Sequence, residues 1–191
     1  SASKFEQKAT AAPALVTVVS ADDIKRYGYR TLADVLLSVP GFNVSYDRNY
    51  AYLSFQGISQ LDSVNSFNSR TLVLVDGHRM NNNLNDAAYI DNAFILDMDL
   101  VDRVEVIQGP NAVLYGNNAF FGVINVVTRK AGQVHGLEVS GDYGSFDSYK
   151  GRMSYGISFT NGVKLLLSGS YYNSDGDDHL TFELPPQGNN V

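Results

Sequence analysis

The run from 99 to 130, DLVDRVEVIQGPNAVLYGNNAFFGVINVVTRK, constrains the fold of this chain more than any other part of the sequence. It predicts a short strand at 104–110 that ends in a Gly-Pro turn, a helical turn at 111–115 that Gly116 stops, and a β-branched strand at 122–128. A chain with this pattern folds back on itself within few residues. Because no catalytic group stands at its turns, the run indicates packing and hinge geometry rather than reaction chemistry.

Two short helices with capping signals are predicted ahead of this run. Ser20 and Asp23 form a capping-box pattern, and Gly28 is suited to end the helix that they start. Thr31 and Asp34 repeat the pattern for a second helix. The apolar stripe and the stop of that helix are Leu32, Val35, Leu36, Val39 and Pro40-Gly41. The acidic residues at both starts are therefore interpreted as caps rather than as paired catalytic acids.

Strands are predicted for the remaining apolar runs, at 14–19, 42–46, 52–55 and 71–75. The last is continuously apolar, which predicts a central strand buried on both faces, and Asp76-Gly77 predicts a hairpin turn after it. Long polar loops are expected at 47–51, 58–70 and 81–93. Strands mixed with short helices and long loops indicate a small mixed α/β domain.

After Ala131-Gly132 the hydrophobic period changes to two. Three successive segments alternate apolar and polar residues, beginning near Leu137, Arg152 and Val163, with a tight turn predicted at Asn161-Gly162. Antiparallel strands of about ten residues with one apolar face are typical of a tilted transmembrane β-barrel, although a soluble β-meander alternates in the same way. The acidic tail that follows these strands is interpreted as a long loop.

The run from 99 to 130 resembles the C-terminal signature of the plug domain of TonB-dependent outer-membrane transporters, with each glycine of the pattern in place. Further segments match the same family in order, at 16–24, 32–41, 55–57 and 72–77. The resemblance to the plug covers about 14–130, and the strands that follow resemble the first strands of the family's barrel.

The resemblance implies three regions. Residues 1–13 form an extended N-terminal segment, 14–130 the plug domain, and 131–191 the first strands and a loop of the barrel. Since three strands cannot close a barrel, we expect the chain to be part of a larger transporter. Its unpaired strands are expected to make the isolated chain self-associate through 137–172, or to be disordered there.

Composition and motifs argue against several classes of function. The net charge of −6 does not suit a nucleic-acid partner, and with no cysteine there is neither a thiol nucleophile nor a thiolate metal site. No nucleophile or phosphate-loop motif occurs, so we expect neither an enzyme nor a resident cofactor. The histidines, His78, His135 and His179, lack metal-ligand spacing. Asp175, Asp177 and Asp178 do not fit a calcium loop and are interpreted as a solvated loop.

Gln56 and Gln108 are the clearest departures from the family pattern. Both precede a glycine at positions where the resemblance implies arginine, and where family members pair that arginine with glutamates on the barrel wall. A neutral amide makes weaker bonds to a carboxylate than a guanidinium does. We expect a polar plug-barrel contact at both positions, with different partners.

By resemblance, the three long loops face the outside of the cell and contact the substrate. The polar residues and tyrosines in them that suit hydrogen bonding or stacking are Tyr50, Gln60, Asp62, Asn65, Asn68, Asn81, Asn82, Asn83, Asn85, Asp86 and Tyr89. For any one of them, ordinary loop polarity explains the residue as well. As a group they are the predicted substrate-binding residues.

The function implied is energy-coupled uptake of a scarce nutrient complex through the outer membrane of a Gram-negative bacterium. The nutrient would be a ferric siderophore, haem or a cobalamin, and no loop motif selects among them. The inner-membrane TonB protein would pull on the N-terminal segment, where Lys4-Phe5-Glu6-Gln7 resembles the stretch just after the TonB-contacting box. The alternative is a soluble mixed α/β binding or scaffolding module with an appended β-meander.

Overall fold

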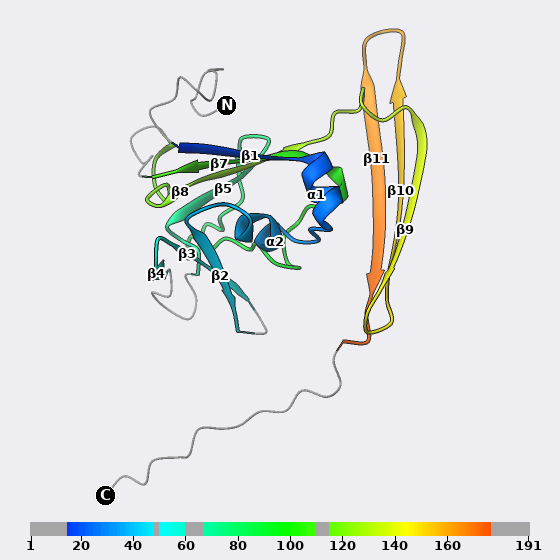
Figure 1. The fold of residues 1–191 in the computed structure, drawn as a ribbon. Coiled ribbons are helices and arrows are strands. Elements are labelled where there is room, and N and C mark those ends of the chain that lie inside the picture. Colours follow the sequence, from blue (N-terminus) through cyan, green and yellow to red (C-terminus); the bar gives the residue numbers. More distant parts are fainter. Residues whose placement is uncertain (1–14, 48–49, 60–66, 110–114, 177–191) are drawn as a thin grey trace, which may run out of the picture. The chain divides into compact units, whose positions relative to one another are not determined.

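The computed structural model of the chain describes residues 15–47, 50–59, 67–109 and 115–176. The chain divides into two compact units, one ending at Arg129 and the other beginning at Lys130 (Figure 1). Each unit is described by itself.

A five-stranded sheet organises the first unit, in the order β1-β7-β8-β5-β6. Its strands are β1 (Leu15–Ser20), β5 (Thr71–Val75), β6 (His78–Arg79), β7 (Val101–Gln108) and β8 (Gly122–Thr128). β1, β7 and β8 are antiparallel neighbours, and β5 runs parallel to β8. The predicted strand at 71–75 is confirmed, and its first four residues are buried. It is not central, however, since only the two-residue β6 lies beyond it.

Both predicted helices form where their caps indicate. α1 (Ala21–Tyr27) begins with a complete capping box, in which the Asp23 backbone N–H donates to Ser20 Oγ over 3.2 Å, and Gly28 ends it at φ +68°. α2 (Leu32–Leu37) has the same box from Thr31 and Asp34. Neither they nor any other helix in the described ranges combines the length and apolar character needed to cross a membrane.

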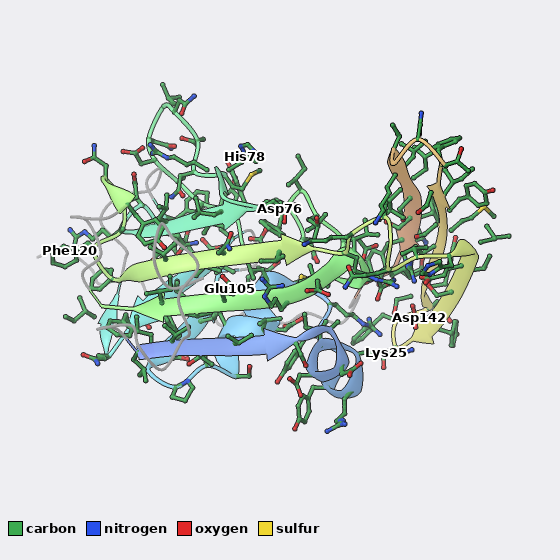
Figure 2. The ribbon with its side chains drawn as sticks, turned by 90° about the horizontal axis from the view of Figure 1, so that it is seen from above. Lys25, Asp76, His78, Glu105, Phe120 and Asp142 are labelled. Carbon is green, nitrogen blue, oxygen red and sulfur yellow. The ribbon has the colours of Figure 1, made fainter. Side chains whose placement is uncertain are left out.

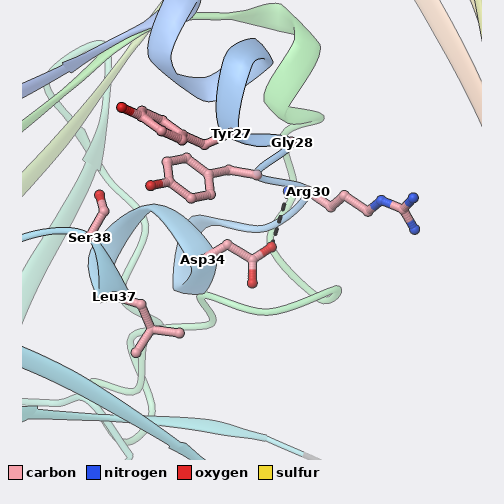
Figure 3. Close-up of a pocket in the computed structure, with 7 residues that line it drawn as sticks. Tyr27, Gly28, Arg30, Asp34, Leu37 and Ser38 are labelled. Atoms are coloured by element: carbon pink, nitrogen blue, oxygen red, sulfur yellow. Dashed lines mark hydrogen bonds between the residues drawn. The ribbon is translucent and has the colours of Figure 1, made fainter.

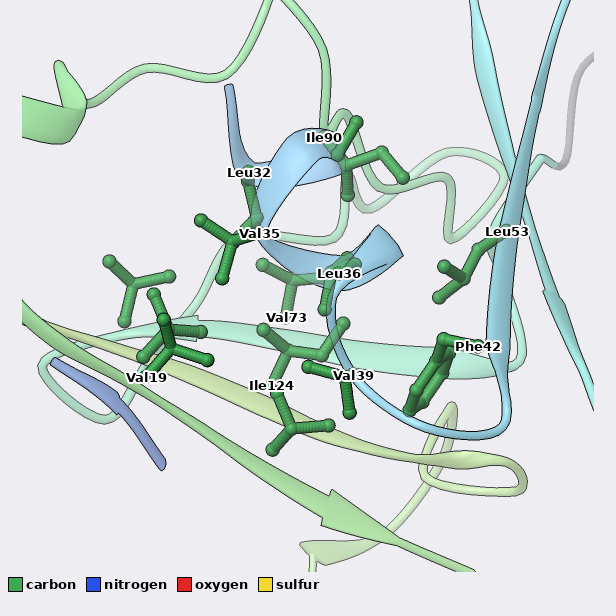
Figure 4. Packing of buried hydrophobic residues seen from close by; sticks show 14 of the residues in the cluster. Val19, Leu32, Val35, Leu36, Val39, Phe42, Leu53, Val73, Ile90 and Ile124 are labelled. Carbon is green, nitrogen blue, oxygen red and sulfur yellow. The ribbon is translucent and has the colours of Figure 1, made fainter. Parts of the chain in front are cut away.

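The main core lies between one face of the large sheet and the elements that cover it, namely α2 and a second sheet (Figure 4). The second sheet has the order β2-β3-β4, with strands Phe42–Tyr46, Ala51–Phe55 and Ile58–Ser59. The fully buried side chains that meet here include Leu32, Val35, Leu36, Val39, Leu53, Val73, Ile90 and Ile124. Burial of each of these side chains stabilises the folded state by about 1.5–3 kcal/mol relative to leaving it in water. This core fixes the bases of the loops.

A smaller cluster covers the opposite face of the large sheet and contains Leu72, Leu74, Ile107, Ala119 and Val123. Here β8 approaches β7 very closely. A Cβ atom on Gly122 would lie 2.5 Å from the carbonyl oxygen of Ile107, a contact that real Cβ atoms do not show. The glycine that opens β8 is therefore required by packing.

The predicted hairpin turn after β5 is confirmed. Asp76 and Gly77 both have positive φ, at 48° and 81°, as a two-residue hairpin turn requires. The Asp76 carboxylate accepts hydrogen bonds from the Thr128 backbone N–H over 2.9 Å and from Thr128 Oγ1 over 2.6 Å. The turn is thus tied to the end of β8. Figure 2 shows Asp76 and His78 at one end of the sheet and Phe120 at the other.

The run at 99–130 folds back as predicted, with two differences. β7 begins at Val101, directly after the short 3₁₀ helix η2 (Met98–Leu100), rather than at 104. Most of the helical turn predicted at 111–115 lies outside the described residues. Gly116 has φ +81°, which suits a stop signal.

The second unit is a three-stranded antiparallel sheet in the order β11-β10-β9. Its strands are β9 (Gly136–Gly144), β10 (Ser148–Ser158) and β11 (Lys164–Asn173). Residues of like character face one another across it, as when Tyr155 opposes Leu137 and Leu167. Leu137 and Leu167 are 61% and 58% exposed, so one face of this sheet is apolar and uncovered. The predicted alternation and the turn at Asn161-Gly162 are confirmed.

The other face of this sheet is polar. Arg152 Nη1 donates to Ser154 Oγ over 2.6 Å and lies 3.7 Å from Glu138 Oε2, while Ser154 and Ser168 share a hydrogen bond of 2.7 Å. The main chain of Val134 crosses this face, because a Cβ on Gly156 would meet the Val134 carbonyl oxygen at 2.1 Å. Within the described residues the sheet ends at β9 and β11. Two-faced strands that do not close are what the first strands of a barrel wall present.

Candidate functional site

One aromatic residue from each of the three predicted loops meets the others at one surface of the first unit. The rings of Tyr50 and Phe67 stack at a centroid distance of 4.6 Å, and Tyr89 lies edge-on to Phe67 at 5.1 Å. Tyr50 and Tyr89 are 6.1 Å apart. Phe67 is buried beneath them at 4% exposure, whereas Tyr89 is 36% exposed. We call these three residues the aromatic platform.

The loop that carries Tyr50 is held by Asp47. One carboxylate oxygen of Asp47 accepts the Tyr50 backbone N–H over 2.8 Å, and the other accepts the Tyr52 hydroxyl over 2.6 Å. The hydrogen bond to Asp47 raises the pKa of Tyr52, because it favours the protonated phenol. The end of the β2–β3 hairpin therefore presents Tyr50 in a defined position.

The buried side chain of Asn68 connects two of the platform loops through hydrogen bonds. Asn68 was expected to contact substrate, and the structure gives it this different role. Its side chain is fully buried and donates from Nδ2 to the carbonyl oxygens of Ala51 and Ala88, each over 2.9 Å. Its Oδ1 accepts the Leu53 backbone N–H over 2.7 Å. With its amide engaged in this way, Asn68 braces the loops and offers no surface to a ligand.

Asn81 also differs from its predicted role. It is 4% exposed, and its Nδ2 donates to the carbonyl oxygens of Thr71 and Asp86 over 3.0 and 2.9 Å. Its Oδ1 accepts the Val73 backbone N–H over 2.9 Å. Asn81 thus ties the 81–93 loop to β5 and, like Asn68, is removed from the set proposed to touch substrate.

The segment 82–86, which we call the exposed turn, projects from the same loop. Asn82 Oδ1 accepts the backbone N–H groups of Leu84 and Asn85 over 3.2 and 3.0 Å. This turn leaves Asn83 exposed and Leu84 95% exposed. Asp86 closes it through an ion pair with Arg79.

The remaining predicted substrate residues, Gln60, Asp62 and Asn65, lie outside the described residues. Sequence reasoning missed Phe67, whose ring stacks on Tyr50 and meets Tyr89 edge-on. The available signal was that Phe67 is the one aromatic residue in the predicted loop at 58–70. It also missed Leu84, because an exposed leucine inside a run of asparagines gives no periodic pattern.

The two glutamines predicted to face the barrel wall have different surroundings. Gln108 is 7% exposed, and its Nε2 donates to the Pro40 carbonyl oxygen over 2.7 Å, so its side chain joins the end of β7 to the exit of α2. Gln56 is exposed, with φ +49°, in the turn after β3. Gln56 is therefore the one of these two glutamines whose side chain is exposed to solvent.

A separate hollow of the first unit lies between the two helices and is lined by none of the platform residues (Figure 3). Tyr27 and Tyr29 stack on one side at 5.7 Å between ring centroids, and the Arg30 backbone N–H donates to Asp34 Oδ2 over 3.0 Å. It is wide open to solvent and holds none of the predicted substrate residues. Among the residues that the structure describes, no cluster of three metal-ligating side chains occurs.

The first unit is thus a mixed α/β unit whose loops gather aromatic and amide side chains at one surface, and strands with one apolar face follow it. The profile of the family described as TonB-dependent Receptor Plug Domain matches residues 8–123. The chain belongs to this family, whose members are transporters and receptors rather than enzymes.

Relatives and solved structures show the same resemblance. The vitamin B12 transporter BtuB of Vibrio vulnificus is 34% identical over 178 residues, which cover 93% of this chain and 28% of that protein. The ferric yersiniabactin uptake receptor FyuA of Yersinia pestis is 25% identical, with a TM-score of 0.66 over 88% of this chain and 25% of the receptor. The ferripyoverdine receptor of Pseudomonas aeruginosa, at 23% identity, shares the fold with a TM-score of 0.71, over 91% of this chain and 22% of the receptor.

The chain therefore spans about a quarter of the length of these relatives. Its two helices, its sheets and the strands that follow correspond to the mixed plug fold and the opening strands that were predicted.

Proposed function

We propose that this chain is the plug region and first wall strands of an outer-membrane transporter that takes up a scarce nutrient complex. The convergence of three loops on the aromatic platform carries the proposal. A binding surface needs a rigid base and accessible polar groups, and here buried asparagines supply the base while the exposed turn supplies the amides. The proposed nutrient is a ferric siderophore, haem or a cobalamin, and the relatives named for vitamin B12 and for ferric yersiniabactin support a cobalamin or a ferric siderophore.

The uncovered apolar face of β9–β11 supports the location. Its apolar residues face one another across the three strands, and their side chains are exposed to solvent. Such a face is more stable against the hydrocarbon of a membrane than in water. The plug would occupy the lumen of the completed barrel, and Gln56 is the proposed polar contact with its wall. The inner-membrane TonB protein is the proposed energy-coupling partner through the N-terminal segment.

Uptake by the full-length receptor tests the proposal. A Gram-negative host without other receptors of this class should grow on one of cobalamin, haemin or ferric siderophores when it expresses the receptor, and only while its TonB protein is functional. The receptor should sediment with the outer membrane. Growth that is equal with and without TonB, or a receptor found in the soluble fraction, would contradict the transporter function and favour a soluble binding module.

A further inference from the structure

We propose that residues 130–135 form a strap that fixes the C-terminal end of the plug to the polar face of β9–β11, so that a pull transmitted through the plug ends there. The docking of the strap stands on the described residues alone, whereas its part in transport rests on the proposed function. Three observations carry the inference: a close backbone contact, a regular path across the sheet, and the backbone bonds that hold both ends of the segment.

The closest approach is between the strap and β10. A Cβ atom on Gly156 would collide with the Val134 carbonyl oxygen and lie only 3.0 Å from the Val134 Cβ. Val134 is 1% exposed, although its neighbours Gln133 and His135 are exposed. A glycine inside a strand often marks a place where another backbone approaches closely. The strap therefore lies directly on the sheet at Val134.

The strap crosses the three strands one after another on this polar face. Gly132 lies beside β11, where a Cβ atom on it would be 3.1 Å from Lys164 Nζ. Val134 covers Gly156 of β10, and Gly136 opens β9 with a φ of +77°. Two residues thus separate each strand from the next. A step of two extended residues spans up to about 7 Å, which covers the roughly 4.8 Å between neighbouring strands.

Both ends of the strap are held by backbone hydrogen bonds. Arg129, the last residue of the first unit, donates its backbone N–H to the Leu100 carbonyl oxygen over 2.8 Å. A turn follows at once, in which the Gln133 N–H donates to the Lys130 carbonyl oxygen over 2.8 Å. If the six residues of the strap were released and extended, they would span about 20 Å. Docking of the strap removes this slack.

The strap bears on how the plug responds to force. A force applied to the N-terminal segment passes through the plug to Arg129 and from there into the wall. With the strap docked, the plug is held at this end and the force acts on the plug's own strands. With the strap released, the same force first takes up the slack and moves the plug as a body. Release should therefore reduce uptake without reducing the binding of the nutrient.

Limited trypsin digestion of the purified full-length receptor tests the docking. Lys130 is exposed, and cleavage after it yields a fragment that begins at Ala131. In Gly156→Ala the added methyl group displaces the strap, so we expect this cleavage to be about fivefold faster or more, because proteolysis follows local opening. Gly151→Ala is the matched control in the same strand, since a Cβ there meets nothing within 4 Å, and it should be cleaved at the unmodified rate.

A second pair of variants decides the question if Gly156→Ala does not assemble. Val134→Gly removes the buried side chain of the strap without adding bulk to the wall. His135→Gly makes the corresponding change at an exposed neighbour. We expect faster cleavage after Lys130 in Val134→Gly and the unmodified rate in His135→Gly.

Uptake by cells separates the strap from the binding surface. The probes are cyanocobalamin, haemin and a ferric siderophore, and the one that the unmodified receptor takes up is used for the variants. Gly156→Ala should bind this probe with unchanged affinity, while its TonB-dependent uptake falls severalfold. Gly151→Ala should keep both binding and uptake. A general folding defect would lower binding as well.

Equal cleavage rates in Gly156→Ala and Gly151→Ala, or in Val134→Gly and His135→Gly, would overturn the docking of the strap. Faster cleavage with unchanged uptake would overturn its part in transport. Uptake by the unmodified receptor that is independent of TonB would instead contradict the proposed function, and the digestion result would still decide whether the strap is docked.

Discussion

Two buried asparagines decide how the loops of this plug are held. Asn68 and Asn81 each use both ends of the amide, accepting one backbone N–H from a strand and donating to two carbonyl oxygens. Local sequence predicts such residues to be exposed, because asparagine in a loop is usually solvated. Their burial depends on partners from other segments of the chain, which no local pattern reveals.

Replacing Asn68 should destabilise the plug strongly. Glycine can adopt the φ of +58° found at position 68, so Asn68→Gly does not strain the backbone. The substitution removes the side-chain partner of the Leu53 N–H and of the Ala51 and Ala88 carbonyl oxygens. The expected loss in the free energy of unfolding is on the order of 3 kcal/mol. Chemical denaturation of the purified chain measures it, with Asn83→Gly as the exposed-loop control. Equal midpoints for both variants would show that Asn68 is not a brace.

The first helix cap should respond to pH. Hydrogen bonds from Ser20 hold the pKa of Asp23 below its ordinary value of 3.8. A depressed folded-state pKa stabilises the fold fully above that ordinary value, and the contribution is lost as the pH falls below it and through the lowered pKa of the folded state. Asp23→Asn should therefore lower the melting temperature at pH 6, and the difference should shrink at pH 3.

Asp22→Asn removes a charge from the same helical turn without touching the cap and serves as the control. A melting-temperature difference for Asp23→Asn that is equally large at pH 3 would contradict this account.

At the scale of elements, much of the structure follows from short patterns. Both capping boxes, the Asp76-Gly77 turn and the alternation of β9–β11 are visible in the sequence because each depends on neighbours within a few residues. The meeting of Tyr50, Phe67 and Tyr89 is not, because it depends on how β3, β5 and the loops pack. The sequence therefore predicts the loops but not the platform that they build.

The apolar face of β9–β11 can be tested with neighbouring leucines on opposite faces. Leu167 lies on the apolar face with Tyr155 opposite, whereas Leu166 lies on the polar face with Gly156 opposite. In the full-length receptor, Leu167→Arg should reduce assembly into the outer membrane, since an arginine toward lipid costs about 2–4 kcal/mol near the midplane. Leu166→Arg should assemble nearly normally.

Heat-modifiable electrophoresis of outer-membrane fractions distinguishes the folded from the unfolded receptor. Normal assembly of Leu167→Arg, or an equal loss for both variants, would count against a lipid-facing assignment of that surface.

At the scale of the whole molecule, the chain pairs a well-packed plug with strands that have no completed wall. The uncovered apolar face and the free edges of β9 and β11 within the described residues should drive self-association of the isolated chain. Light scattering on the purified chain should show oligomers. A monodisperse monomer with β9–β11 ordered would contradict this expectation.

The most direct test of the central claim is ligand binding to intact cells that express the full-length receptor, measured for cyanocobalamin, haemin and ferric siderophores. The variant carrying alanine at Asn82, Asn83 and Asn85 should lose most of its affinity for the nutrient that the unmodified receptor binds. The variant carrying alanine at Asp22 and Asp23 should keep it, because the cap satisfies backbone groups far from the platform in sequence. Full affinity in the triple-asparagine variant would contradict the placement of the binding surface on these loops.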